Sequence, residues 1–577
     1  MKKLVLSVVA LMHIGLFTAQ TEETSNKALA VAEKTWYHMD HAAAGVYGIN
    51  TENAYKYLQS RGLKPTTVVV GVLDSGVEVD HPGLINNMWK NPGEIPGNGI
   101  DDDNNGYIDD VHGWNFIGGK NGDVDVDNFE VTRMVKKYQP IFEGGTSAEN
   151  KANQAQRPEE FEIYLKSKRI FMEKSMEAQQ GYANYARIKE LIPSAIKLLN
   201  GKPLSQEVLA SIKPSTQEEA MSLQLLMGAI QDPEMKDKPS EEVEKTMTKE
   251  IGAALDYYGP QATKQYNLDF DPRAEIVADD YENYKERIYG NNHYEGPDAQ
   301  HGTHVAGIIA GYAQGEEPQY GVAHQVAKIM TVRTVPNGDE RDKDVANAIR
   351  YAVDNGAKIL NMSFGKPVSP GKEEVWKAFE YAQSKGVLLV KAAGNENEDI
   401  QEHIYYPTNF KNATDPAPFV NNTIIVGAST DDNEFLRAEF SNYNKKMVDV
   451  FAPGQGIYST VPDGKYEYLQ GTSMASPVVA GAAAVLWAYM PNLTPEQLIE
   501  ALVKTANVSK VNAMLPSNEN NRFDLISRAG GVIDLGKAAQ YAYTQFYNGN
   551  SADSKNLRRA ANVQKTKTAK KHPSTVK

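Results

Sequence analysis

The sequence predicts an α/β fold in which helices cover both faces of a mostly parallel sheet. Two observations support this prediction. Short runs rich in Val, Ile and Leu alternate with segments long enough to form helices, as in βα units. The short runs are apolar throughout, which is typical of parallel strands buried on both faces. Between 128 and 289 the alternation stops and apolar residues recur at helical spacing, so this stretch is predicted to be an α-helical insertion.

The first strand is expected at 67–73, where Asp74 follows a continuous β-branched run. In the insertion, helices are expected at 161–176, 185–199, 218–230 and 243–258, separated by loops that contain Pro or Gly. After it, strands are expected at 328–335, 357–364, 387–393, 423–428 and 447–452. The helices expected beside these strands are 343–355, 373–385, 478–487 and 535–543.

The domain organisation follows from these shifts in pattern. Residues 20–127 and 290–545 are predicted to form one discontinuous domain, interrupted by the insertion 128–289. The tail 546–577 is polar and basic and is predicted to be disordered. Residues 1–19 have the form of a signal peptide, with Lys2 and Lys3 ahead of an apolar stretch and small residues before Gln20. The product is therefore expected to be exported, to the periplasm or out of the cell.

Composition excludes several classes of function. The net charge of −14 argues against a nucleic-acid partner. The absence of Cys excludes disulfides, thiolate catalysis and Cys-ligated metals. After the signal peptide no apolar run reaches the roughly 20 residues of a membrane span. Nothing in the sequence indicates an organic cofactor, and nothing predicts the oligomeric state.

Four polar residues stand at the ends of expected elements and match the needs of serine-based acyl transfer. A serine hydroxyl needs a base, an orienter for that base, and donors aimed at the oxyanion. Asp74 ends the first strand, and His301 begins a helix of small residues. Asn395 follows the strand at 387–393, and Ser473 stands at the start of a buried helix. Taken alone, Ser473 is more simply explained as a helix N-cap.

The chain order Asp, His, Ser is that of subtilisin. Four blocks carry a resemblance to the subtilases, the subtilisin-like serine peptidases: 72–77, 301–307, 393–395 and 471–477. The resemblance covers roughly 36–117 and 290–545, and it implies a subtilisin-like fold. It also implies a secreted serine endopeptidase that works through an acyl-enzyme. In such an enzyme Asp74 orients His301, His301 deprotonates Ser473, and Asn395 with the Ser473 N–H holds the oxyanion.

The resemblance further implies an extended groove for a polypeptide substrate. The residues expected to line it are Ser363, Phe364, Gly365, Gly394 and Glu396. The insertion joins the segments that carry Asp74 and His301, so it is expected to emerge near the cleft as a lid or exosite. One alternative is a non-catalytic binding protein of the same fold, with its cleft closed by the insertion. A serine esterase is disfavoured, because the chain lacks a Gly-x-Ser-x-Gly elbow.

The acidic loop at 98–110 is the candidate for a metal site. Its predicted ligands are Asp101, Asp103, Asn105, Asp109 and Asp110, and structural Ca²⁺ is the expected ion. The loop is not an EF-hand, because the twelfth position is His112 rather than Glu. A solvated acidic turn is the alternative. His301 and His304 are spaced like zinc ligands, but no third ligand is evident, and His304 is expected to be a packed helix residue.

Overall fold

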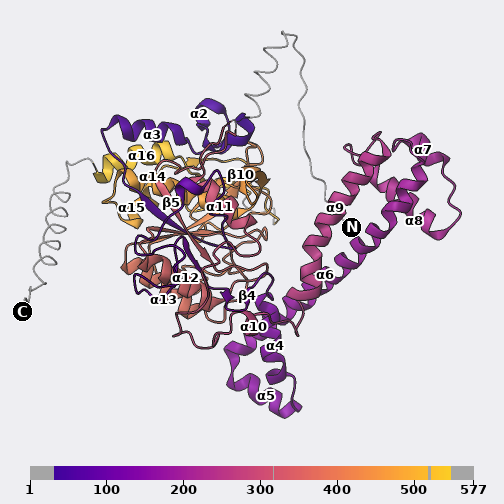
Figure 1. The fold of residues 1–577 in the computed structure, drawn as a ribbon, viewed down its shortest axis with the longest axis horizontal. Coiled ribbons are helices and arrows are strands. Elements are labelled where there is room, and N and C mark those ends of the chain that lie inside the picture. Colours follow the sequence, from indigo (N-terminus) through magenta and orange to yellow (C-terminus); the bar gives the residue numbers. More distant parts are fainter. Residues whose placement is uncertain (1–30, 316, 517–520, 548–577) are drawn as a thin grey trace, which may run out of the picture.

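A nine-stranded sheet forms the centre of the computed structural model, which describes residues 31–315, 317–516 and 521–547 (Figure 1). The strand order is β12-β13-β9-β8-β7-β6-β1-β5-β2. The sheet is parallel except at its edge, where β12 pairs antiparallel with β13. The signal peptide predicted at 1–19 lies outside the described residues, and so does the tail predicted at 546–577, apart from its first two residues.

The six predicted strands begin and end within a few residues of the expected ranges, whereas β2, β12 and β13 at the edges of the sheet and the strands of the two hairpins were not predicted. The central strand β1 (Val68–Asp74) pairs with β5 on one side and β6 on the other. The other strands are β2 (Gly113–Asn115), β5 (Ala327–Arg333), β6 (Ile359–Met362), β7 (Leu388–Ala392), β8 (Thr423–Ser429), β9 (Val450–Pro453), β12 (Asn507–Val508) and β13 (Gly531–Val532). Two hairpins lie outside this sheet: β3 (Gly118–Gly119) with β4 (Gly122–Asp123), and β10 (Ile457–Val461) with β11 (Lys465–Leu469).

Helices cover both faces of the sheet, so the predicted fold class is confirmed. Val70 and Val72 of β1 are buried in the core on one face, and Leu73 is buried in the core on the other. The first core is built with α3 (Thr51–Ser60), α11 (Gln300–Ala310), α14 (Thr472–Tyr489), α15 (Pro495–Lys504) and α16 (Leu535–Ala542). The second is built with α12 (Asp342–Asp354) and α13 (Lys372–Ser384). Shorter helical turns are η1 (Trp36–His38), α2 (His41–Ala44), η2 (Ile85–Asn87), η4 (Phe523–Leu525) and η5 (Tyr543–Tyr547).

Between β4 and α11 the regular elements are helical, and we call residues 130–276 the helical arm. In Figure 1, α6 and α9 run side by side away from the sheet, and α7 and α8 lie at the far tip. The arm consists of α4 (Glu130–Phe142), α5 (Ser147–Gln156), α6 (Pro158–Leu199), α7 (Gln206–Ser211), α8 (Gln217–Ala229), α9 (Ser240–Pro260), η3 (Gln261–Gln265) and α10 (Arg273–Ile276). The boundaries 128 and 289 stay a prediction.

One predicted break in the arm is absent. The helices expected at 161–176 and 185–199 are a single helix, α6. Gly181, which indicated a loop, lies inside it, and a Cβ at this position would come within 2.7 Å of the Tyr258 ring on α9. Here glycine permits the close approach of two helices rather than ending one of them.

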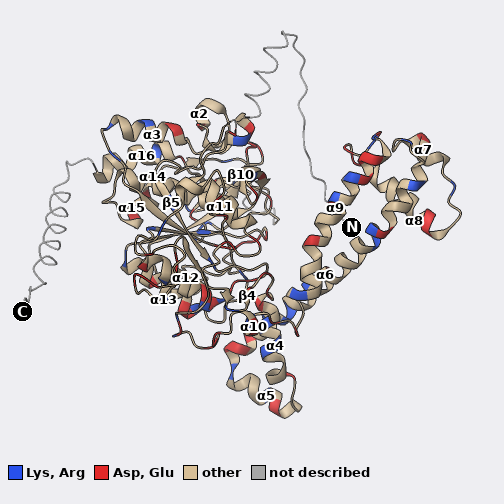
Figure 2. Ribbon diagram, in the orientation of Figure 1, with Lys and Arg blue, Asp and Glu red and all other residues tan. Residues whose placement is uncertain are grey.

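The base of the arm is joined to the sheet domain by buried ion pairs. Glu130, at the start of α4, lies 2.7 Å from the ammonium of Lys366, and both side chains are 1% exposed. Arg133 contacts the same carboxylate at 2.8 Å. At the other end of the arm, Arg273 pairs with Asp344 of α12 at 2.7 Å. Figure 2 shows charged residues along the arm and at its base. These contacts fix the base of the arm, because separating the pairs would leave charges buried without partners.

Replacing Glu130 by Gln is expected to destabilise the protein by about 3 kcal/mol at pH 7, since removing one member of a buried pair strands the other. Neighbouring cations lower the pKa of Glu130 to about 2, despite the opposing effect of burial. A carboxylate with a lowered pKa contributes its whole stabilisation of the folded state above the ordinary pKa of 4.5, and this contribution is lost as the pH falls towards 2. The difference between wild type and Glu130→Gln in urea unfolding should therefore shrink below about pH 4.5.

Glu282→Gln is the matched control, because Glu282 pairs with Lys137 at 3.4 Å with both side chains exposed. Its effect is expected to stay within about 1 kcal/mol. Equal unfolding midpoints for Glu130→Gln and Glu282→Gln would contradict an anchoring role for Glu130.

Candidate active site

Asp74 and His301 form a hydrogen-bonded pair at the carboxyl end of the sheet. Asp74 is the last residue of β1 and its side chain is 2% exposed, whereas His301, at the start of α11, is 40% exposed. The His301 Nδ1 lies 2.6 Å from the Asp74 Oδ1. Gly302 permits this approach, because a Cβ there would lie 2.0 Å from the Gly76 carbonyl oxygen. The imidazole is thus fixed in orientation by the end of the central strand.

The charge of Asp74 sets the protonation of His301. Burial lowers the pKa of His301, but the Asp74 carboxylate outweighs it through charge and hydrogen bond, and the net pKa lies above the ordinary 6.5. Asp298 adds to this rise. Because a carboxylate only accepts hydrogen bonds, Nδ1 carries the proton when the ring is neutral, and Nε2 is left free to accept one. This is the tautomer that a general base for serine requires.

Ser473 is the second residue of α14 and does not cap it. The N-cap position is occupied by Gly471, and no side chain makes a capping hydrogen bond. At this position the Ser473 N–H has no partner within the helix, so it is free to bind an anion. The hydroxyl donates to the Ser363 carbonyl oxygen at 3.0 Å, and within the described residues no hydrogen bond joins it to His301. Such catalytic hydrogen bonds often tighten only when substrate binds.

The helix extends back from the apolar run 478–487 through Pro477 to Thr472, so Ser473 stands at its start, as expected. Proline has no N–H, so Pro477 cannot donate to the Ser473 carbonyl oxygen one turn before it. That oxygen instead accepts the hydroxyl of Ser363 at 2.8 Å. Ser363 is held in turn by Asn361, which also accepts a hydrogen bond from Ser476. The proline therefore leaves free the carbonyl that joins α14 to the segment directly after β6.

Asn395 is positioned by its neighbour in space, Thr472. The Asn395 Oδ1 accepts hydrogen bonds from the Thr472 N–H at 2.8 Å and from the Thr472 hydroxyl at 2.9 Å. The Asn395 Nδ2 lies on the side of Gly471 and Ser473, where a Cβ added to Gly471 would be 3.5 Å from it. Since the oxygen is held by Thr472, the amide group is not free to flip, and its nitrogen stays on the side of Gly471.

Replacing Asn395 by Ala is expected to lower kcat about 10²–10³-fold, the loss known for removing one oxyanion donor from subtilisin. Thr472→Val, which removes the hydroxyl that orients the amide, should lower kcat by a smaller factor, about tenfold, with little change in KM. Both are measured by steady-state hydrolysis of a chromogenic peptide. A Thr472→Ser variant, which keeps the hydroxyl, should recover most of the activity. Equal kcat values for Thr472→Val and Thr472→Ser would contradict the orienting role of the Thr472 hydroxyl.

The predicted substrate-binding residues line two connected cavities. A cavity of about 180 Å³ is lined by Ser363, Phe364, Gly365 and Gly394 together with Asn395 and Ser473. Glu396 instead lines a larger cavity of about 880 Å³, to which Gly365 also contributes. These residues follow β6 and β7, which are adjacent in the sheet, and β6 pairs with β1. The carboxyl ends of three neighbouring strands therefore bring Asp74, the substrate segments and Asn395 to one edge.

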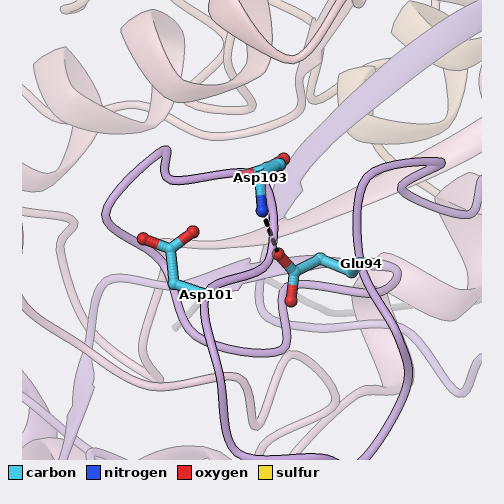
Figure 3. Close-up of side chains that lie close together, drawn as sticks. All are labelled: Glu94, Asp101 and Asp103. Atoms are coloured by element: carbon cyan, nitrogen blue, oxygen red, sulfur yellow. Dashed lines mark hydrogen bonds between the residues drawn. The ribbon is translucent and has the colours of Figure 1, made fainter.

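The acidic loop forms a group of carboxylates that differs from the predicted set. Asp101 and Asp103 lie with Glu94, and each offers an oxygen within 4.8 Å of the others (Figure 3). These three residues could hold a metal ion. Glu94 was missed by sequence reasoning, because it precedes the loop and shares no spacing with it.

The other predicted ligands take different partners. Asp109 accepts the backbone N–H groups of Gly97 and Gly99, so its carboxylate shapes the turn ahead of the loop. Asp110 is buried and accepts hydrogen bonds from Asn105 and Tyr351. Burial raises the pKa of Asp110 to about 6, against the lowering effect of these donors. Asn105 also donates to Asp103 at 3.2 Å. Asp109 and Asp110 thus lie outside the group of three.

His304 is a packed helix residue. Its side chain is fully buried, and its Nε2 lies 3.0 Å from the Ile457 carbonyl oxygen and 3.1 Å from that of Glu467. Burial lowers the pKa of His304 to about 3, so the ring stays neutral. Nε2 donates to carbonyl oxygens and so has no lone pair to offer a metal, and Nδ1 is buried with no partner among the described residues.

Within the described residues, α14 is the one helix long and apolar enough to cross a membrane. In this protein 94% of its apolar window is buried against other elements, so it forms the centre of the core below the site.

The chain resembles known proteins over most of the sheet domain. The sequence pattern of the subtilase family matches residues 66–530 of the 577-residue chain. Thermitase from Thermoactinomyces vulgaris is 41% identical over 187 residues, which are 32% of this chain and 60% of thermitase. Subtilisin DY from Bacillus licheniformis is 36% identical over 207 residues, 36% of this chain and 70% of that protein.

A thermophilic serine proteinase from Bacillus sp. (strain AK1) is 41% identical over 198 residues, 34% of this chain and 45% of its own. The aligned segments thus span 45% of this relative and 60% of thermitase. The family match covers the segments that hold Asp74, His301, Asn395 and Ser473. The chain therefore belongs to the subtilase family of serine peptidases.

Proposed function

We propose that this protein is a secreted serine endopeptidase that cleaves polypeptides through an acyl-enzyme intermediate. The observation that carries the proposal is the pair of Asp74 and His301, 2.6 Å apart, on the same sheet edge as Ser473 and Asn395. A neutral imidazole held by a buried carboxylate is the base that a serine hydroxyl requires. Membership of the family supports a polypeptide substrate.

The geometry supports a sequence of steps. His301 Nε2 takes the hydroxyl proton as the Ser473 Oγ attacks the peptide carbonyl carbon. The oxyanion that forms is held by the Asn395 amide and the Ser473 N–H. His301 then gives its proton to the leaving amine, and the acyl-enzyme forms. A water molecule, deprotonated by His301, attacks the ester, and the carboxylic acid leaves while the proton returns to Ser473.

The competing function is a binding protein whose cleft is closed by the helical arm. The cavity of about 180 Å³ argues against this function, because Ser473 and Asn395 are part of its lining. The larger cavity adjoins it. Each residue type of the catalytic set is present as well. The open cavity beside the nucleophile favours the peptidase.

The test separates the two functions directly. The purified protein is treated with a fluorophosphonate probe and incubated with a peptide library, and the products are identified by mass spectrometry. A peptidase will be labelled at Ser473 and will cut within peptides, whereas Ser473→Ala will do neither. A wild-type protein that is folded yet neither labelled nor active would establish the binding reading.

We also propose export, supported by the signal-like sequence of residues 1–19. Fractionation of cells that express the full chain should find it in the periplasm or medium, with an N-terminus near Gln20. An intact N-terminus in the cytoplasm would contradict export.

Structural Ca²⁺ is proposed at Glu94, Asp101 and Asp103. Carboxylate oxygens are the ligands that this hard cation prefers, and three together repel one another without it. Adding millimolar CaCl₂ to EDTA-treated enzyme is expected to raise the unfolding temperature by several degrees, since a ligand bound only by the folded state stabilises it. Asp101→Asn should abolish most of the shift, whereas Asp463→Asn, on an exposed turn between β10 and β11, should preserve it. An equal shift in both variants would place any bound calcium elsewhere.

A further inference from the structure

A groove beneath the helical arm continues the active-site cavity. The larger cavity, about 880 Å³, is lined on one side by α6 and the end of α9 and on the other by the segments after β6 and β7. It shares Gly338, Gly365 and Tyr405 with the cavity that contains Ser473. The arm is fixed here, because Lys166 of α6 donates to the Pro367 carbonyl oxygen at 2.7 Å. We call the two cavities together the arm groove.

The arm groove lies on the acyl side of the scissile bond. The leaving amine must take its proton from His301, so that half of the substrate lies beside α11. Neither His301 nor any other residue of α11 lines either cavity. The half that stays on Ser473 as the acyl group therefore leads into the arm groove, first past Gly365 and then below α6.

The lining of the arm groove is acidic. In the larger cavity three cationic side chains, Lys166, Arg169 and Lys174, face six carboxylates: Glu173, Glu177, Asp256, Asp339, Glu396 and Glu398. Lys174 pairs with Glu177 at 2.8 Å, and Lys166 contacts a backbone carbonyl. Three further carboxylates also have partners, because Glu398 lies beside His403 and both Asp339 and Glu396 accept hydrogen bonds. Among the described residues Glu173 and Asp256 make no hydrogen bond or ion pair, so they are the carboxylates open to a basic ligand. In the smaller cavity the lining holds one charged side chain, Glu340, and no cation.

Glu340 supplies an independent sign of a missing partner. Its side chain is 2% exposed, and its Oε1 is buried without a hydrogen-bond partner among the described residues. Such an atom costs free energy unless something pairs with it. Two cations lie near, but among the described residues neither bonds to the Glu340 carboxylate: Lys366 pairs with Glu130 and Asp342, and Lys391 donates to the Ala392 carbonyl oxygen at 2.6 Å. Burial raises the pKa of Glu340 to about 8, and Asp339 adds to the rise while Lys366 opposes it.

We propose that the arm groove selects polypeptides with Lys or Arg on the acyl side of the scissile bond, and that Glu340 receives the basic side chain nearest to it. This specificity rests on the proposed peptidase function. A cavity of about 180 Å³ has the room of about six water molecules, enough for a long unbranched side chain. A bound ammonium or guanidinium would pair with Glu340 and favour its ionised form over the protonated form that burial favours, and the carboxylates below α6 would attract further basic residues.

The first test compares matched peptides that differ only in the residue that supplies the scissile carbonyl. Peptides with Lys or Arg there are expected to show kcat/KM values about 100-fold above those with Gln or Leu. Glu340→Gln should remove most of that preference, so that its kcat/KM values for the Lys, Gln and Leu peptides lie within about threefold of one another. Retention of the full preference by Glu340→Gln, or an initial preference for Leu, would overturn the role of Glu340.

The second test uses surface variants, because Glu340 is buried and its replacement could affect folding. Glu173 and Asp256 are exposed residues of α6 and α9 that line the groove. The double variant Glu173→Gln, Asp256→Asn is expected to lower kcat/KM several-fold for long peptides with basic residues further along the acyl side. The loss should be larger at low salt, because ions screen exposed charges. Short uncharged peptides should be cut at the wild-type rate.

Glu241→Gln, Glu244→Gln is the control, since both residues are exposed on α9 and lie outside the groove lining. Equal behaviour of the two double variants would overturn the proposal for the wider groove. Failure of the parent function is distinguished by the fluorophosphonate probe. A chain that is labelled at Ser473 and cuts uncharged peptides without any basic preference refutes the arm groove alone, whereas an unlabelled chain refutes the peptidase.

Discussion

Replacing Ser473 by Ala is expected to lower kcat about 10⁶-fold, the loss known for the nucleophile of subtilisin. The remaining rate would come from binding and from the oxyanion donors, which the substitution leaves in place. The change removes one hydroxyl, whose hydrogen bond goes to the Ser363 carbonyl oxygen, so the fold should persist. The rates are measured with an internally quenched peptide, and circular dichroism establishes that both proteins are folded.

The control for this experiment is Ser147→Ala, an exposed serine at the start of α5 in the arm. It should keep wild-type kcat and fluorophosphonate labelling. A Ser473→Ala protein that keeps even 1% of wild-type activity after removal of contaminating host peptidases would contradict the assignment of Ser473 as the nucleophile.

The fold class and the four catalytic candidates could be predicted from sequence for a shared physical reason. A parallel strand that is buried on both faces needs an uninterrupted apolar run. For this reason β1 could be predicted from the apolar residues that precede Asp74. Parallel strands direct their carboxyl ends to one edge, so polar residues after β1 and β7 could be expected to meet. Local signals were enough because each residue stands at the end of its own element.

What sequence reasoning missed depends on partners far away in the chain. Gly181 was interpreted as a loop between two helices, because nothing in the neighbouring sequence reveals that Tyr258 packs against it. Asp109 and Asp110 were predicted as ligands from their place in the loop, but the group of neighbouring carboxylates consists of Asp101 and Asp103 with Glu94, which precedes the loop. Glu340 carried no motif at all. The role proposed for Glu340 rests on its place in the lining of the cavity that contains Ser473, more than a hundred residues later in the chain, which only the folded structure shows.

Thr472 is an intermediate case. It stands inside the block 471–477 that carried the resemblance, yet its role was not foreseen. A threonine at the start of a helix is typically explained as a cap, but here its hydroxyl and N–H both serve Asn395. The signal that could have found it is the adjacency to Ser473, since a residue beside the proposed nucleophile is well placed to support the proposed oxyanion donor.

Replacing Asp74 by Asn is expected to lower kcat about 10⁴-fold at pH 7, because an amide can donate to Nδ1 and so favour the wrong imidazole tautomer. The variant should also change the pH dependence. Asp74 holds the pKa of His301 above 6.5, and His301 must be neutral to act as a base, so wild-type kcat/KM should rise with pH through that raised pKa. Without the carboxylate, burial lowers the pKa, and the acid limb of the profile should move to lower pH.

Asp298→Asn separates the two effects of Asp74, charge and orientation. Asp298 raises the pKa of His301 through its charge alone, whereas Asp74 also makes the hydrogen bond to Nδ1. The Asp298 variant should therefore move the acid limb slightly in the same direction and keep kcat within a few-fold of wild type. Asp80→Asn, an exposed residue near the same strand end, should change neither. If Asp74→Asn moved the limb to higher pH, the Asp74 carboxylate could not be what stabilises the protonated imidazole, and the base would have to be sought elsewhere.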